Sequence, residues 1–516
     1  MPALPPLRTI NEVLEHQRKW AETTGLTLDP TAVSLADRSS ALFVDELSSL
    51  TLADLTAGAG SELGRIHSLR SSSCLALNVF EPWRSNPRPL ATVFGGSVQA
   101  LSFEEKQRTG LQGVAPHLDV FLAGRPTTVG IESKFLEMYS PTDNHFSDSY
   151  FDVDGLWQGL ENSRNLALEI ASGGQRFHWL HAAQLLKHAL GLRRNQSDNF
   201  RLVLVWYRLD SGVAEQIESE IGRFAIGVSD DFDFTSMTYQ ELVWRLNQLD
   251  EPMPGYLEYL SHRYRLGGEW QRRLPLLDSG SRPSINRLTS LDSTIEALDI
   301  DELSGAYFRS IAEAPQRTLR QKKLIVGHDG ASDASTPNRE KVVAKALFNQ
   351  RAPLQIGEHS VTLIDYEVPL RAERADGGIG EIDLLGLDET NRLWIIELKV
   401  SPNTETPLKA LLQALRYSAI LDANRRAIAM EIGERTMKQI RWPAVLAVSA
   451  DRVYWERLTS TAKAGAWLEA ISRLTDRIES TLGLSVWLLD LGDLKAEVID
   501  GRARLVSAPD VATIRS

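Results

Sequence analysis

Asp119, Glu132 and Lys134 are three ionisable residues set among apolar ones, in Leu118-Asp119-Val120-Phe121-Leu122 and Val129-Gly130-Ile131-Glu132-Ser133-Lys134. Residues two apart on a strand share a face, so Glu132 and Lys134 would point the same way. Buried charges need a partner or a metal ion, and paired carboxylates suit Mg²⁺, which prefers oxygen ligands and keeps several waters. Such a cation polarises a phosphodiester and activates water, while a lysine can orient that water. The chemistry indicated is hydrolysis of a nucleic-acid phosphodiester.

The second half of the chain repeats this order of residues. Asp383 precedes Glu397 by 14 positions and Lys399 follows, whereas Asp119 precedes Glu132 by 13 positions. An interstrand ion pair at the end of a sheet is the structural alternative for each set. Glu104-Glu105-Lys106 has the same Glu-x-Lys form, but we expect it to lie in a polar helical stretch without an upstream Asp.

Strands and helices that could position these residues also recur in the same order. In the first half we expect strands at 118–122, 128–135 and 202–207, with helices at 177–192 and 239–249. In the second half we expect helices at 339–348 and 408–421, with strands at 381–387, 393–400 and 444–448. Each Asp then lies on the first strand of a hairpin and each Glu-x-Lys on the second.

Length and composition set the limits of the architecture. A chain of 516 residues, with 43% hydrophobic and 24% charged residues, is typical of two or three globular domains. We predict a first domain at 1–275, a Ser/Gly/Pro-rich linker with an embedded helix at 276–337, and a second domain at 338–516. A net charge of −12 argues against a passive nucleic-acid coat protein.

Cellular location follows from what the chain lacks. No apolar run approaches the roughly 18 residues that cross a bilayer, and the first residues have no signal-peptide pattern. Cys74 is the single cysteine, which excludes an intrachain disulfide and a cysteine-built zinc site. We therefore expect a cytoplasmic protein with no membrane partner.

These motifs resemble the PD-(D/E)xK phosphodiesterase superfamily, which has a restriction-endonuclease-like fold. Pro116-His117-Leu118-Asp119-Val120 with Gly130-Ile131-Glu132-Ser133-Lys134-Phe135 resembles a bacterial restriction-endonuclease-like family, over about residues 61 to 249. Glu381-Ile382-Asp383, Ile396-Glu397-Leu398-Lys399 and Gln413-Ala414-Leu415-Arg416-Tyr417 resemble the RecB and NucS branch, over about residues 338 to 448. The resemblance implies metal ligation by four carboxylates and catalysis by two lysines, namely Asp119, Glu132, Asp383, Glu397, Lys134 and Lys399. By the same resemblance, Glu340, on the helix that opens the second domain, matches an acidic residue that the superfamily carries on a helix. Glu62 would be its counterpart in the first domain.

A glutamine on the helix after each hairpin completes the candidate sites. Gln413 and Tyr417 are one helical turn apart, so both can face the second site and hold DNA or the lysine. An amphipathic helix with Tyr417 in the core is the alternative. Gln184 is the counterpart in the first half, with His188 where a tyrosine would stand. A zinc site of His178, His181 and His188 lacks an evident fourth ligand.

The resulting expectation is a tandem α/β nuclease with two restriction-endonuclease-like domains, each a mixed central sheet flanked by helices. It would hydrolyse DNA with Mg²⁺, for which Mn²⁺ could substitute, and restriction or defence against foreign DNA fits the resemblance. Two alternatives are a nucleic-acid-binding scaffold with one or both folds inactive, and an RNA-directed nuclease. A homo-oligomer is compatible with either.

Overall fold

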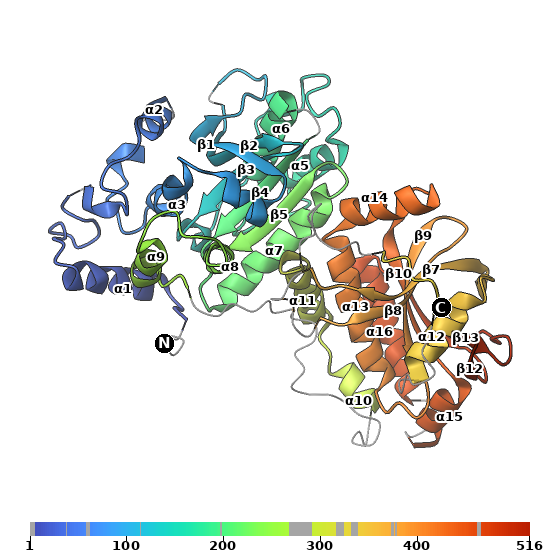
Figure 1. Cartoon of the computed structure of the whole chain (residues 1–516). Coiled ribbons are helices and arrows are strands. Elements are labelled where there is room, and N and C mark those ends of the chain that lie inside the picture. The colour runs from blue at the N-terminus through green and yellow to red at the C-terminus, as the bar shows by residue number, and fades with distance from the viewer. Residues whose placement is uncertain are drawn as a thin grey trace. The chain divides into compact units, whose positions relative to one another are not determined.

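The computed structural model describes residues 6–37, 39–57, 62–113, 115–196, 199–267, 291–315, 325–331, 339–372, 376, 379–461 and 466–515. These residues form two compact units, unit 1 within 6–267 and unit 2 within 291–515 (Figure 1). The domain boundaries predicted at residues 275 and 338 lie outside the described residues and stay predictions. Within the described part, no helix is both long and apolar enough to cross a membrane.

Unit 1 is a five-stranded sheet with helices on both faces. Its strands are β1 (Ser97–Lys106), β2 (His117–Arg125), β3 (Thr128–Lys134), β4 (Phe200–Trp206) and β5 (Asp233–Thr238). Its helices are α1 (Ile10–Thr23), α2 (Ser49–Ala57), α3 (Ser72–Phe80), α4 (Ala91–Phe94), α5 (Glu161–Ser172), α6 (Ala182–Gln196), α7 (Gly212–Val228), α8 (Tyr239–Leu246) and α9 (Tyr256–Tyr264). The strand order is β1-β2-β3-β4-β5. The first three strands are antiparallel and the last three are parallel.

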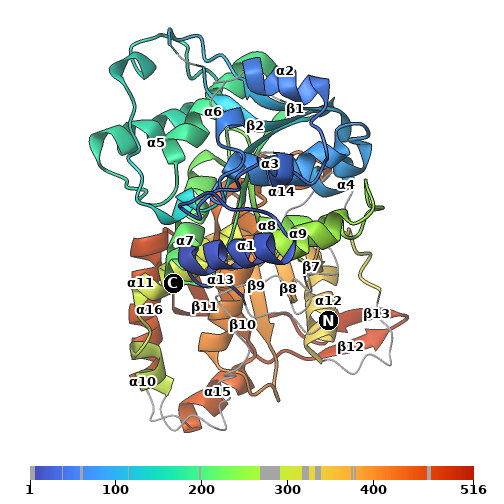
Figure 2. The ribbon, with the colours of Figure 1, turned by 90° about the vertical axis from the view of Figure 1, so that its left-hand side faces the viewer.

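The two faces of this sheet have different cover. Alternate apolar residues such as Val120 and Ile131 join one core cluster with α3, α8 and α9. On the other face α6 packs on β3 and β4, α7 packs on β5, and α5 packs on both helices. Helices α1 and α9 lie next to each other in Figure 2 and are in contact. Hydroxyl caps begin α7 and α8, since Ser211 accepts from the N–H of Ala214 and Thr238 from that of Glu241.

Unit 2 has a wider sheet of the same kind. Its strands are β6 (Leu354–Ile356), β7 (His359–Pro369), β8 (Glu381–Leu387), β9 (Arg392–Lys399), β10 (Arg441–Ala450), β11 (Val486–Asp490) and β14 (Ala512–Arg515), with a separate hairpin β12 (Ala496–Ile499) and β13 (Arg502–Leu505). Its helices are α10 (Leu291–Glu296), α11 (Ile300–Ala312), α12 (Arg339–Asn349), α13 (Pro407–Asp422), α14 (Arg425–Thr436), α15 (Arg452–Thr461) and α16 (Ala466–Leu482). The sheet order is β14-β11-β10-β9-β8-β7-β6.

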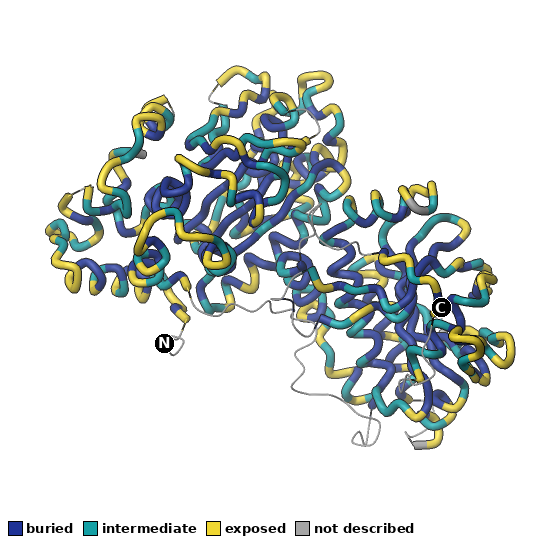
Figure 3. Tube along the Cα trace, viewed as in Figure 1, coloured by how far each residue is buried: buried dark blue, intermediate teal, exposed yellow. Residues whose placement is uncertain are grey.

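Helix α12 covers one face of the second sheet and α13 the other. Apolar residues of α12 join Leu384, Ile396 and Leu398 in one core cluster, and the β12–β13 hairpin packs against the same helix. Helix α13 packs on β9 and β10, with α11 beside it. It begins at Pro407 after Thr406, whose hydroxyl accepts from the N–H of Lys409. Figure 3 shows that the central strands of both units are the buried part of the trace.

The two units share a five-stranded core. In β7-β8-β9-β10-β11, as in β1-β2-β3-β4-β5, two antiparallel pairs are followed by two parallel pairs. The crossover after β3 carries α6 and the crossover after β9 carries α13. Both units are therefore mixed α/β sheets flanked by helices, in line with a restriction-endonuclease-like fold, and the predicted fold class is confirmed.

Three expectations about local structure need correction. The helix predicted at 177–192 begins at Ala182, because the Glu220 carboxylate accepts the backbone N–H groups of His178 and Leu180 and holds that segment in a turn. Glu104-Glu105-Lys106 ends strand β1 and is not helical. The predicted linker contains two helices, α10 and α11, which pack against α16 and α13 of unit 2.

Candidate active sites

The β2–β3 hairpin brings Asp119 and Glu132 to the same face of the first sheet. Val120 pairs with Ile131, and both face the core on the α3 side. Side chains alternate along a strand, so their neighbours Asp119 and Glu132 face the side covered by α6. The two carboxylates therefore lie on one face of the sheet.

Direct contacts connect the predicted residues of the first site. The Ser133 N–H, between Glu132 and Lys134, donates to Asp119 Oδ2 at 2.6 Å. The Lys134 ammonium lies 2.7 Å from Glu132 Oε1 and donates to Gln184 Oε1 at 3.1 Å. Asp119, Glu132, Lys134 and Gln184 thus form one connected group, as the spacing along the chain indicated.

His188 joins this group although it was not among the predicted site residues. It is one turn after Gln184 on α6, and its Nε2 lies 2.9 Å from Glu132 Oε2. The two atoms are close without the alignment of a hydrogen bond, and neither has a hydrogen-bond partner among the described residues. His188 and Glu132 are 0% and 2% exposed. The Gln-x-x-x-His spacing was the available signal, since it matches Gln-x-x-x-Tyr in the second half.

Two glycines let α6 approach the strands closely enough for these contacts. A Cβ on Gly130 would lie 2.8 Å from Leu118 Cδ1 and 2.9 Å from Leu192 Cδ1. A Cβ on Gly191 would lie 2.6 Å from the carbonyl oxygen of Gln107, just after β1. Larger residues at either position would push the helix away from the sheet, and Gln184 and His188 with it.

The two carboxylates of the first site have pKa values shifted in opposite directions. Burial, and then the charge of Glu132, raise the pKa of Asp119. Burial opposes ionisation of Glu132, but Lys134 and His188 outweigh it and lower its pKa to about 2. Burial also opposes the charge of Lys134, yet Glu132 and Asp119 raise its pKa. Glu132 and Lys134 are therefore an ion pair, and the negative charge of Glu132 disfavours ionisation of Asp119.

The second site repeats these contacts on β8 and β9. The Leu398 N–H, between Glu397 and Lys399, donates to Asp383 Oδ2 at 2.7 Å. The Lys399 ammonium donates to Glu397 Oε1 at 2.8 Å. Glu397 Oε2 is buried without a hydrogen-bond partner among the described residues, as Glu132 Oε2 is. Leu384 and Leu398 face the α12 side, so Asp383 and Glu397 face α13.

Two further carboxylates border the second site. Glu340, at the start of α12, accepts the Val400 N–H at 3.1 Å and the Asn403 side chain at 2.6 Å. Its charge helps to raise the pKa of Asp383. Glu405, which was not predicted, lies 3.1 Å from the Lys399 ammonium and also pairs with Lys409. Glu340 thus borders the site, while its role as a ligand stays a prediction.

Tyr417 reaches the second site, whereas no contact ties Gln413 to Lys399 in the described residues. The Tyr417 hydroxyl lies where a Cβ on Gly380, just before β8, would have to stand. Burial, and then Glu397 and Asp383, raise the pKa of Tyr417. Gln413 Oε1 is buried without a donor from the described residues. The Gln-x-x-x-Tyr pair is therefore arranged differently from Gln184 and His188.

The glutamates of the two sites differ in charge balance. Burial raises the pKa of Glu397, and Lys399 does not overcome it. In the first site the imidazole of His188 adds to the effect of the lysine, and the pKa of Glu132 falls. Burial opposes the charge of Lys399, but Glu397 and Asp383 raise its pKa. The imidazole is the main chemical difference between the two sites.

The residues present fit a metal ion that brings its own waters. Each site has a buried carboxylate oxygen, on Glu132 and on Glu397, that accepts no hydrogen bond from the described residues. A divalent cation in each site would satisfy that oxygen. Neither site offers three ligand atoms within 4.8 Å; among described residues only His359, Asp388 and Glu389 do so. The Asp388 carboxylate there already accepts from Thr390, Arg392 and Trp394, so that group is a capped turn.

Other sequence expectations can be placed around the first site. His178, His181 and His188 do not form a three-ligand group among the described residues. Glu62 begins a short 3-10 turn, but its side chain lies outside the described set. Glu104, dismissed from sequence because of its polar surroundings, lies on β1 and its charge helps to raise the pKa of Asp119.

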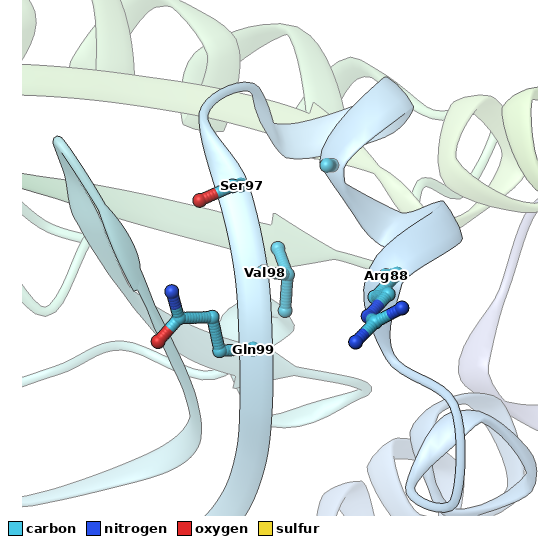
Figure 4. A pocket seen from close by; sticks show the side chains of 5 residues that line it. Arg88, Ser97, Val98 and Gln99 are labelled. Atoms are coloured by element: carbon cyan, nitrogen blue, oxygen red, sulfur yellow. The ribbon is translucent and has the colours of Figure 1, made fainter.

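A pocket of about 320 Å³ on unit 1 is separate from both candidate sites (Figure 4). It is lined by Arg88, Ala91, Ser97, Val98 and Gln99. The lining contains a single cation and no carboxylate, so it lacks the groups that metal-dependent hydrolysis needs.

Residues 42–265 match the model of a protein family described as Restriction Endonuclease associating with ARP. The match covers all of β1–β5 and somewhat less than half of the chain. It extends beyond the predicted limits of 61 and 249 at both ends. The first half is thus similar to a restriction-endonuclease-like family. No match was found among curated proteins or among solved structures.

Proposed function

We propose that this chain is a metal-dependent nuclease that hydrolyses phosphodiester bonds of DNA, with one catalytic centre in each unit. The observation that carries the proposal is the recurrence of one arrangement in two sheets of low mutual identity. In each, a backbone N–H between Glu and Lys holds the Asp carboxylate, and the lysine pairs with one glutamate oxygen. The other glutamate oxygen is buried without a geometrically aligned hydrogen bond from the described residues.

Each residue has a defined part in this chemistry. Asp119 with Glu132, and Asp383 with Glu397, would hold the cation, for which Mg²⁺ fits the oxygen donors and Mn²⁺ could substitute. When bound, the cation supplies charge stabilisation for the phosphoryl transition state and lowers the pKa of a bound water. Lys134 and Lys399 are positioned to orient the attacking water or to stabilise negative charge on a phosphate oxygen.

Burial explains why the lysines are ionic partners before the reaction. Glu132 and Glu397 are 2% and 3% exposed, and an ionised carboxylate at such a depth is costly without a counter-charge. Each ammonium supplies that charge, so a lysine is already next to the group that would hold the cation. This placement supports catalytic roles for Lys134 and Lys399.

The choice of DNA as substrate rests on family likeness. The match of residues 42–265 to a restriction-endonuclease family supports DNA cleavage and defence against foreign DNA. Its description also names an association with ARP, which we extend to this chain as part of the proposal. For unit 2, the resemblance of its motifs to the RecB and NucS branch of the PD-(D/E)xK superfamily supports the same chemistry.

The test is a cleavage assay of the full chain on plasmid, linear duplex, single-stranded DNA and RNA, with Mg²⁺ or with EDTA. We expect DNA cleavage that needs metal, that is reduced by Asp119→Asn or Asp383→Asn, and that is lost in the double variant. Lys106→Ala is the matched control, because Lys106 is the exposed lysine of the Glu-x-Lys on β1. Cleavage of RNA alone would make it an RNA-directed nuclease, and binding without cleavage of any nucleic acid would make it a scaffold.

A further inference from the structure

The first site contains an imidazole at a position where the second site has none. His188 Nε2 lies 2.9 Å from Glu132 Oε2, and Tyr417 occupies the corresponding position on α13. Resting on the proposed function, we propose that His188 is a metal ligand together with Glu132, and that the first site selects a transition-metal ion such as Mn²⁺ over Mg²⁺. The second site, built from oxygen donors, takes Mg²⁺.

The state of the two facing atoms carries this inference. His188 is fully buried, and both of its ring nitrogens lack hydrogen-bond partners among the described residues. Glu132 Oε2 is also buried and lacks such a partner. Burying polar atoms without hydrogen bonds is unfavourable. A cation between the nitrogen and the oxygen would satisfy one atom of each residue at once.

The separation of the two atoms suits ligands of a single ion. Bonds from a small divalent ion to nitrogen or oxygen measure about 2.1 Å, so ligand atoms at right angles stand about 3 Å apart. The observed 2.9 Å agrees with this value. Without metal, the same contact serves as an ion contact between the imidazole and the carboxylate, and the experiment below distinguishes the two states.

Ligand chemistry then sets the choice of metal. Mg²⁺ strongly prefers oxygen ligands and holds its waters tightly, whereas imidazole suits transition-metal ions. In the second site, the described groups that act on Glu397 are Lys399, Lys409, the Tyr417 hydroxyl and further carboxylates, with no imidazole among them. One chain would therefore carry two centres with different metal preference.

Mn²⁺ electron spin echo spectroscopy of the full chain in the Asp383→Asn background reads out this ligand directly. We expect modulation from ¹⁴N of a bound imidazole, which changes to the ¹⁵N pattern when the protein is grown with ¹⁵N-histidine. His188→Gln should remove the modulation and weaken Mn²⁺ binding about tenfold or more, with a smaller effect on Mg²⁺.

Matched controls are the two other imidazoles near this site. His181 directly precedes α6, and His117 on β2 lies 3.5 Å from Glu104; His181→Gln and His117→Gln should keep the modulation. His359→Gln, which removes the imidazole beside Asp388 and Glu389, is a third control and should also keep the modulation. If His188→Gln does not fold, the isotope shift together with retention in all three controls supports His188, and loss of the modulation in any of them would overturn it. Bound Mn²⁺ without nitrogen modulation, or modulation that survives His188→Gln, would overturn the inference.

The outcomes also separate this inference from the proposed nuclease. Nitrogen-coordinated Mn²⁺ in a protein that cleaves no nucleic acid would keep the metal site and reject the nuclease. Metal-dependent cleavage that requires Asp119, with no nitrogen at the bound Mn²⁺, would keep the nuclease and reject His188 as a ligand.

Discussion

The Tyr417 hydroxyl occupies the space beside Gly380 that any side chain at that position would need. Gly380 directly precedes β8, which carries Asp383, and Tyr417 is on α13, which covers the same face. The absence of one Cβ thus sets how closely the helix approaches the strand that holds a predicted ligand. Tyr417 is 5% exposed, so its hydroxyl has little room to move elsewhere.

Gly380→Ala should therefore displace Tyr417 and disturb the second site. We expect cleavage in the Asp119→Asn background to fall by up to about 10²-fold, the loss typical of a displacement of roughly 1 Å near a catalytic group. Adding Tyr417→Phe removes the atom nearest to the new methyl group, so the effect of Gly380→Ala should shrink in that background. Gly433→Ala is the control, because its Cβ would meet nothing closer than 3.6 Å. Equal losses with and without the Tyr417 hydroxyl would refute the coupling.

Replacing Lys399 should cost both activity and stability. Lys399 is 4% exposed and pairs with Glu397 and Glu405, so Lys399→Met leaves the buried Glu397 carboxylate without the ammonium that pairs with it. We expect a loss of about 3 kcal/mol in EDTA, partly recovered with Mg²⁺, and no cleavage in the Asp119→Asn background. Melting curves with and without metal measure the first effect. Lys409→Met removes the ion pair with Glu405 and a weaker, more distant charge from Glu397, so its loss of stability should be smaller and depend less on metal. Full cleavage by Lys399→Met would refute the catalytic role of Lys399.

Sequence patterns predicted the parts of each site that lie on neighbouring strands. Asp119, Glu132 and Lys134 are close in the chain, and a hairpin with alternating side chains fixes their common face. The same local logic gave Asp383, Glu397 and Lys399. Local spacing was sufficient because the pairing of two adjacent strands involves few long-range choices.

Residues brought in by tertiary packing were harder to predict. His188 approaches Glu132 only because Gly130 and Gly191 allow close packing of α6, and glycine spacing in a sequence does not reveal which neighbour fills the space. Glu104 was set aside as part of a polar stretch, yet its strand lies next to β2. Such contacts depend on the order of strands in the sheet, which the local pattern leaves undetermined.

Divalent cations should stabilise the protein against heat. Burial and the neighbouring glutamates raise the pKa values of Asp119 and Asp383, so the metal-free sites contain repulsion that a cation would relieve. At a metal concentration about a hundredfold above Kd, binding contributes about 2.7 kcal/mol, or a shift of roughly 5–10 °C for a unit of this size. Asp119→Asn and Asp383→Asn should each weaken the response. Asp388→Asn should lower stability but leave the metal-induced rise in melting temperature unchanged. A melting temperature that does not respond to Mg²⁺ or Mn²⁺ would count against both metal sites.

Gly191→Ala tests whether the position of α6 controls the first site. The added methyl group would meet the backbone of Gln107, and backbone cannot rotate away as a flexible side chain can. Overpacking of this kind costs about 1–3 kcal/mol, and the helix should shift outward with Gln184 and His188. We expect lower stability and, in the Asp383→Asn background, a larger relative loss of cleavage than of folded protein at 25 °C. Gly212→Ala, at the open start of α7 with nothing within 4 Å of the new methyl group, is the matched control. Full first-site activity in a folded Gly191→Ala protein would show that Gln184 and His188 need not lie where this packing holds them.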